Sequence, residues 1–137
     1  QAMIHVRQAN PNGCGIAALA MVCDLTYDEV FAELSSDWPQ DRDFAESGTH
    51  DSILEWFLAR HGYVWRQLFV GWQMDEWPPA PFAPRHIAMV NQPSGNTHYV
   101  VMTEDGTVLD PLADEPTTLD QWQKISNVRG VWKEPNG

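Results

Sequence analysis

Residues 8–21 read QANPNGCGIAALAM, so Gln8 stands six positions before Cys14 and an apolar, alanine-rich run follows. The run predicts a largely buried helix over 14–23. A cysteine in the first turn of a helix lies at the positive end of the helix dipole, which favours its thiolate form. A side-chain amide just upstream can donate to the oxyanion that forms when a thiolate attacks a carbonyl. The segment therefore offers two parts of a thiol acyl-transfer site.

A base and a carboxylate occur together later in the chain. The run HYVVMT, which starts at His98, precedes an Asp-Gly turn, after which the chain returns to Asp110. β-Branched and alternating residues on both sides of such a turn predict a hairpin. With the turn centred on Asp105, His98 faces a position near Leu112. Asp110 is then its diagonal neighbour on the same face of the sheet, within side-chain reach.

Length and composition are those of one folded domain, which we assign to residues 1–137. A chain of 137 residues can bury a sizeable core. A hydrophobic content of 43% and seven tryptophans favour a folded globule over a disordered chain. Gln1 and Ala2 precede Met3, and a cloning remnant is one interpretation of these two residues.

Charge and hydropathy exclude several classes of partner. The net charge of −11 disfavours nucleic acid or an anionic membrane, because both need clustered Lys and Arg. No apolar stretch approaches the ~20 residues that span a bilayer, and no signal peptide precedes the first predicted helix. We therefore expect an acidic, cytoplasmic protein without a membrane span.

The two cysteines predict free thiols. Cys14 and Cys23 are nine residues apart, which is roughly 13 Å along one helix. A disulfide needs Cα atoms within about 7 Å, and no second pair completes a zinc site. Cys23 is expected to be a buried core residue. We expect no metal and no organic cofactor.

The remaining pattern is helical in the first half of the chain and strand-rich in the second. Thr26 begins a capping-box sequence for a helix that ends at Leu34, and 35–48 is expected to be a loop. Thr49 is predicted to cap a third helix, which ends at Gly62. Further elements are expected as strands at 63–70, 86–91, 98–103, 107–109 and 128–132, and as a short helix from Thr118 to about Ile125. This order predicts an α+β architecture in which the helix of Cys14 packs against a mostly antiparallel sheet.

Residues 71–84 are predicted to form a long loop with four prolines and several aromatic residues. Trp72 and Trp77 are candidates for substrate contact, as is Gly13 beside the cysteine. The loop is also a candidate surface for a protein partner, because aromatic residues on proline-stiffened loops make contacts at low entropic cost. A lid packed onto its own domain is the alternative.

The order Gln, Cys, His, Asp resembles the papain-like cysteine peptidases, most of all the double-glycine peptidase domains of bacteriocin-exporting ABC transporters. The matching motifs are Gln8, Cys14-Gly15 with its alanine-rich helix, 98–101, Asp110-Pro111 and the capped helix within 48–63. The chain departs from the pattern at Gly13, where the family usually carries an acidic residue. The transporters' membrane and nucleotide-binding segments are absent from this chain.

The resemblance implies a papain-like fold and a peptide or protein substrate. It implies that Cys14 is the nucleophile and that His98 acts as general base and later as acid. Asp110 would orient the imidazole, and Gln8 would form the oxyanion hole with the backbone amide of Cys14.

Each of these residues also fits a purely structural role, as a core cysteine, a surface amide, a strand-end histidine or a turn aspartate. Three hypotheses about function therefore stay open. The first is a cysteine peptidase or isopeptidase. The second is a thiol amidase or acyltransferase on a small substrate. The third is a catalytically silent papain-like binding or inhibitor protein, with its acidic surface and aromatic loop directed at a protein target.

Overall fold

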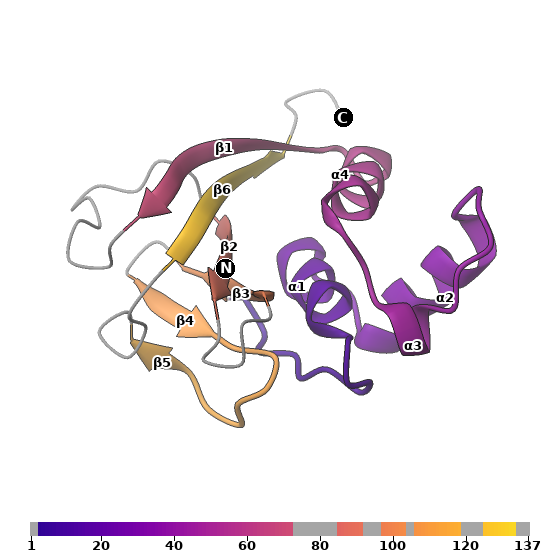
Figure 1. The fold of residues 1–137 in the computed structure, drawn as a ribbon, viewed down its shortest axis with the longest axis horizontal. Coiled ribbons are helices and arrows are strands. Elements are labelled where there is room, and N and C mark those ends of the chain that lie inside the picture. Colours follow the sequence, from indigo (N-terminus) through magenta and orange to yellow (C-terminus); the bar gives the residue numbers. More distant parts are fainter. Residues whose placement is uncertain (1–2, 73–84, 92–96, 104–105, 119–124, 134–137) are drawn as a thin grey trace.

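The helices lie on one side of the molecule and the sheet on the other (Figure 1). The computed structural model describes residues 3–72, 85–91, 97–103, 106–118 and 125–133. The helices are α1 (Cys14–Cys23), α2 (Tyr27–Asp37), α3 (Phe44–Ser47) and α4 (Asp51–Arg60). The strands are β1 (Tyr63–Trp72), β2 (Arg85–Asn91), β3 (Thr97–Met102), β4 (Thr107–Leu109), β5 (Thr117–Thr118) and β6 (Ile125–Lys133). No helix in these ranges is long and apolar enough to cross a membrane.

Helix α1 has the predicted bounds and is buried on almost every side. Its residues from Gly15 to Val22 are all buried, as expected for a run of small and aliphatic side chains without charge. Helix α2 begins with the predicted capping box, in which the Thr26 hydroxyl accepts from the Glu29 N–H and the Glu29 carboxylate accepts from the Thr26 N–H. Val30 and Leu34 of α2 are buried, and they pack this face of the helix against the core.

Two predictions about the helices are wrong. Helix α2 continues to Asp37, and the expected loop contains α3, because the Asp43 carboxylate accepts hydrogen bonds from the N–H groups of Ala45 and Glu46. The N-cap of α4 is His50, without a side-chain cap bond, in place of Thr49. Thr49 instead packs against α1, where a Cβ added to Gly15 would lie 1.8 Å from its Oγ1. A tertiary contact has thus replaced the predicted local cap.

The sheet is antiparallel, and its described strands have the order β1-β6-β2-β3-β4-β5. In the predicted hairpin, Val101 pairs with Leu109 and Met102 with Val108, which is the register assumed in the sequence analysis. Strands β1, β2 and β6 contain the predicted strands and run slightly beyond them.

The expected loop over 71–84 begins later than predicted. Gly71 and Trp72 belong to β1, where Trp72 pairs with Ile125, because pairing with β6 continues to the end of the strand. Residues 73–84, which include Trp77, lie outside the described residues. The predicted helix from Thr118 to about Ile125 falls mainly on 119–124, which also lie outside them, and its two end residues belong to β5 and β6.

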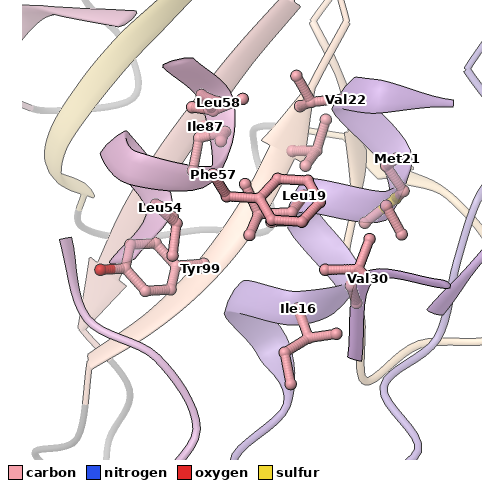
Figure 2. Close-up of a cluster of buried hydrophobic side chains, with 14 of the residues drawn as sticks. Ile16, Leu19, Met21, Val22, Val30, Leu54, Phe57, Leu58, Ile87 and Tyr99 are labelled. Carbon is pink, nitrogen blue, oxygen red and sulfur yellow. The ribbon is translucent and has the colours of Figure 1, made fainter. Parts of the chain in front are cut away.

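One hydrophobic core joins the helices to the sheet. Figure 2 shows part of it, with Leu19 of α1, Phe57 of α4, Ile87 of β2 and Tyr99 of β3 gathered between the elements. Leu19 and Phe57 are fully buried. Because Tyr99 follows His98 on β3, the same packing that buries α1 brings Cys14 toward His98. The prediction that the cysteine helix packs against the sheet is confirmed, and its contacts with the sheet are mainly with β3, the strand of the histidine.

Candidate active site

His98 and Asp110 form a hydrogen-bonded pair in the site. His98 is buried on β3, and its Nε2 lies 2.6 Å from Oδ1 of Asp110. Asp110 follows β4, and the same Oδ1 accepts the N–H of Leu112 at 3.0 Å. His5 donates from Nε2 to the backbone oxygen of Asp110 at 2.8 Å. These contacts hold the Asp110 carboxylate and backbone in place, and the carboxylate in turn orients the imidazole of His98.

Cys14 is the first residue of α1, with its side chain half-buried against β3. The His98 side chain and the backbone of Tyr99 and Gly15 lie close enough to the thiol to lower its pKa by hydrogen bonding. Since Nε2 of His98 is engaged with Asp110, Nδ1 is the ring nitrogen left for Cys14. The N-cap residue, Gly13, supplies no side-chain cap, and the first turn of α1 carries no acidic residue. The positive end of the helix dipole thus stays directed at the sulfur.

The pKa values of the three groups shift together. Burial raises the pKa of the Cys14 thiol, but the hydrogen bonds from His98 and the Tyr99 backbone and the charge of His98 outweigh it, so that the pKa is lowered. Burial lowers the pKa of His98, while Asp110 and Cys14 more than offset this and raise it to about 9. Burial raises the pKa of Asp110, which the His98 hydrogen bond and charge reverse to a net lowering. At neutral pH these directions favour imidazolium between carboxylate and thiolate.

Cys23 has the opposite environment at the other end of α1. It was predicted to be buried in the core, but it is only half-buried and packs against the edge of the hydrophobic core. Burial, and then the negative charge of Asp24, raise its pKa to about 12. Its thiol is therefore neutral over the physiological range and unreactive.

Gln8 lies beside the site, but its amide is turned toward its own loop. Its backbone N–H donates to the carbonyl of Pro111 at 3.0 Å, next to Asp110. Its Nε2 donates to the backbone oxygens of Asn10 and Pro11, both at 2.9 Å. Its Oε1 is buried without a hydrogen-bond partner among the described residues. In this rotamer the amide N–H groups donate to carbonyls of the loop.

Cys14, His98 and Gln8 open onto a cavity of about 660 Å³. The cavity extends to the start of α4, where it is lined by Thr49, His50, Asp51 and Ser52, and it also meets Met89 and Leu112. Because several of these groups are polar, the cavity can hold an extended peptide backbone as well as a small amide. No group of three or more potential ligand side chains that could hold a metal ion occurs in the ranges that the structure describes.

Three residues that support the site were not found from the sequence. The Tyr99 hydroxyl donates to the Asp51 carboxylate, whose other oxygen lies 2.9 Å from Nη1 of Arg129. This connects the start of α4 to β3 and β6, and two of its members, Asp51 and Tyr99, line the same cavity as His98. No local sequence pattern indicates the connection, because its members come from three distant segments.

Comparison with known proteins supports the fold. No protein-family model matches the chain, and no curated protein does. Among solved structures, the chain is similar to a double glycine motif protease from an AMS/PCAT transporter, in a crystal structure that contains the leader peptide. The TM-score is 0.62 at 13% sequence identity, and the match covers 97% of this chain and 91% of that one. The chain therefore has the papain-like fold of the double-glycine peptidases, as the sequence resemblance implied.

Proposed function

We propose that this protein is a cysteine peptidase that hydrolyses a peptide or isopeptide bond. The observation that supports this best is the arrangement of the three groups at the cavity, where Asp110 holds His98 by a hydrogen bond and His98 lies close enough to Cys14 to lower the pKa of its thiol. The pKa directions agree with it, because they favour the thiolate that nucleophilic attack requires.

In the proposed reaction, the Cys14 sulfur forms a bond to the carbonyl carbon, and the carbonyl electron pair moves onto oxygen. The backbone N–H of Cys14 donates to this oxyanion. The C–N bond then breaks as His98 gives its proton to the leaving amine, which leaves a thioester on Cys14. Water attacks the thioester, its proton passes to His98, and Cys14 departs as thiolate. Asp110 keeps the imidazole in the orientation that both proton transfers need.

Gln8 has a defined part in this proposal. The amide N–H group that donates to the carbonyl of Pro11 must turn toward the oxyanion, where it adds a second donor to the Cys14 backbone N–H, while the other N–H group stays on the carbonyl of Asn10. The turn is favoured by the unpaired Oε1 in the observed rotamer, because a buried carbonyl oxygen without a donor costs about 1–3 kcal/mol.

A peptide is the proposed substrate class. The structural neighbour is a protease whose crystal structure contains a leader peptide, and the cavity here has polar walls suited to a peptide backbone. Two free cysteines suit a reducing compartment, so we place the reaction in the cytoplasm.

A catalytically silent binding protein is the second candidate, and the Gln8 rotamer favours it. With both amide hydrogens directed at loop carbonyls, the oxyanion side of the site is incomplete. A protein that kept this rotamer with a peptide bound would hold the peptide without cleaving it.

A peptide-library digestion separates the two candidates. Wild-type protein, Cys14→Ala and Cys23→Ala are incubated with the library, and products are identified by mass spectrometry. The proposal predicts cleavage at a defined bond by wild type and Cys23→Ala, and none by Cys14→Ala. Binding of library peptides with no new termini in any sample would reject the peptidase.

A further inference from the structure

The ring of Tyr27 occupies the space beside the residue that precedes the cysteine. Tyr27 is the first residue of α2 and is 9% exposed. A Cβ added to Gly13 would lie 1.9 Å from the Tyr27 hydroxyl oxygen and 3.0 Å from its Cζ. No side chain fits at position 13 while this hydroxyl is present. Glycine at 13 and tyrosine at 27 therefore form a matched pair.

The Tyr27 hydroxyl also anchors the loop before Cys14. It donates to Oδ1 of Asn10 at 2.8 Å. The backbone oxygen of Asn10 in turn accepts the Gly13 N–H at 3.0 Å and Nε2 of Gln8 at 2.9 Å. Through Asn10, Tyr27 thus holds both the turn that leads into α1 and the amide of Gln8. Burial raises the pKa of Tyr27, so its hydroxyl stays protonated and remains a donor.

We propose that Tyr27 is a positioning residue for the oxyanion side of the site. It acts through Asn10 on the two groups assigned to the oxyanion, the Gln8 amide and the backbone N–H of Cys14. This inference rests on the proposed function, since it assigns Tyr27 a part in that reaction. His98 and Asp110 are held by separate contacts, so we expect loss of the Tyr27 hydroxyl to leave the base and its carboxylate in place.

The test compares Tyr27→Phe, which removes only the hydroxyl, with the control Tyr63→Phe, at a tyrosine outside the cavity lining. Hydrogen exchange by NMR follows the Gln8 side-chain N–H and the Gly13 backbone N–H. We expect both to exchange about tenfold faster in Tyr27→Phe, from the loss of one buried hydrogen bond.

With peptide substrate, kcat of Tyr27→Phe should fall about tenfold while KM stays within about twofold of wild type. The pH profile of Cys14 alkylation is unchanged, and Tyr63→Phe alters none of these quantities.

A second pair of variants tests the close contact directly. Gly13→Ala places a Cβ against the Tyr27 hydroxyl, whereas in the Tyr27→Phe background the nearest ring atom is Cζ at 3.0 Å. The loss of thermal stability caused by Gly13→Ala should therefore be smaller in that background. Equal losses in both backgrounds would contradict the matched pair.

The outcomes distinguish this inference from the proposed function. Unchanged exchange at Gln8 and Gly13 in Tyr27→Phe overturns the inference. A fall in kcat that is matched by an equal fall in alkylation also overturns it, because Tyr27 would then support the nucleophile helix as a whole. Faster exchange in a protein that cleaves no peptide rejects the proposed function and leaves the anchoring by Tyr27 intact.

Discussion

Gln8 directs both N–H groups of its amide at carbonyls of its own loop. Its position six residues before Cys14 follows from the sequence, and the structure does place it beside the cavity. Its rotamer could not be predicted, because it depends on where the oxygens of Asn10 and Pro11 point after the chain has turned. The sequence thus identifies the residue but leaves its hydrogen-bond partners undetermined.

The proposed role of Gln8 makes a kinetic prediction. Replacing Gln8 by Ala should lower kcat by about 10²–10³, which corresponds to the ~2.7–4 kcal/mol that one oxyanion donor supplies. The exposed Gln40 offers the matched control, since Gln40→Ala should leave kcat unchanged. Steady-state kinetics on the cleaved peptide measure both variants. If Gln8→Ala has the wild-type kcat, the Gln8 amide donates only to the loop carbonyls and has no part in binding the oxyanion.

His98 owes its raised pKa to its two neighbours. Removing the charge of Asp110 by Asp110→Asn should lower the pKa of His98 from about 9 toward its ordinary value of 6.5. The exposed Asp114, which pairs with Arg7 at the surface, provides the control Asp114→Asn, and this variant should leave the titration unchanged. NMR titration of the imidazole measures both. A value near 9 in Asp110→Asn would show that Asp110 does not hold the proton on His98.

Elements with a local signal were predicted, and elements that depend on tertiary contacts were not. Helix α1 and the hairpin of β3 and β4 follow from an apolar run and an Asp-Gly turn, which are local features. Helix α3 was missed because four residues are too few to show helical periodicity. The start of α4 was misplaced because Thr49 packs against Gly15, which lies far away in the sequence.

The capping box of α2 gives a prediction at this scale. Thr26→Ala removes the acceptor for the Glu29 N–H, and should lower the free energy of unfolding by about 1 kcal/mol. Ser36→Ala, on the exposed face of the same helix, should change it by less than about 0.5 kcal/mol. Urea unfolding followed by circular dichroism measures both. Equal effects would show that the cap does not limit the stability of α2.

The sequence predicts the α+β class for the whole molecule, because helical and strand-like patterns occupy separate halves of the chain. The sequence also predicts that Cys14 lies near His98 and Asp110, because the helix that starts at the cysteine must bury its apolar surface on the sheet. The connection of Asp51, Tyr99 and Arg129 was not predictable, because it needs the packed arrangement of α4, β3 and β6.

The pKa of Asp110 connects the site to the stability of the molecule. Because this pKa is lowered from 3.8 in the folded state, the carboxylate contributes stability above about pH 3.8, and the contribution is lost as the pH falls through the folded value. The difference in unfolding free energy between wild type and Asp110→Asn should therefore be largest near pH 5, where Asp110 is ionised and the stability from the raised pKa of His98 is also fully present, and it should shrink below pH 4. Urea midpoints at pH 7, 5 and 3 measure it. A constant difference would contradict the lowered pKa.

The proposed function requires that Cys14 and His98 form a working thiolate–imidazolium pair. The most direct measurement is the rate of Cys14 alkylation by iodoacetamide against pH, in Cys23→Ala and in the same protein with His98→Ala. Alkylation should be fast, should persist below pH 7 and should be lost when His98 is removed. Slow alkylation that titrates near the free-thiol pKa of about 8.5, with or without His98, would contradict it.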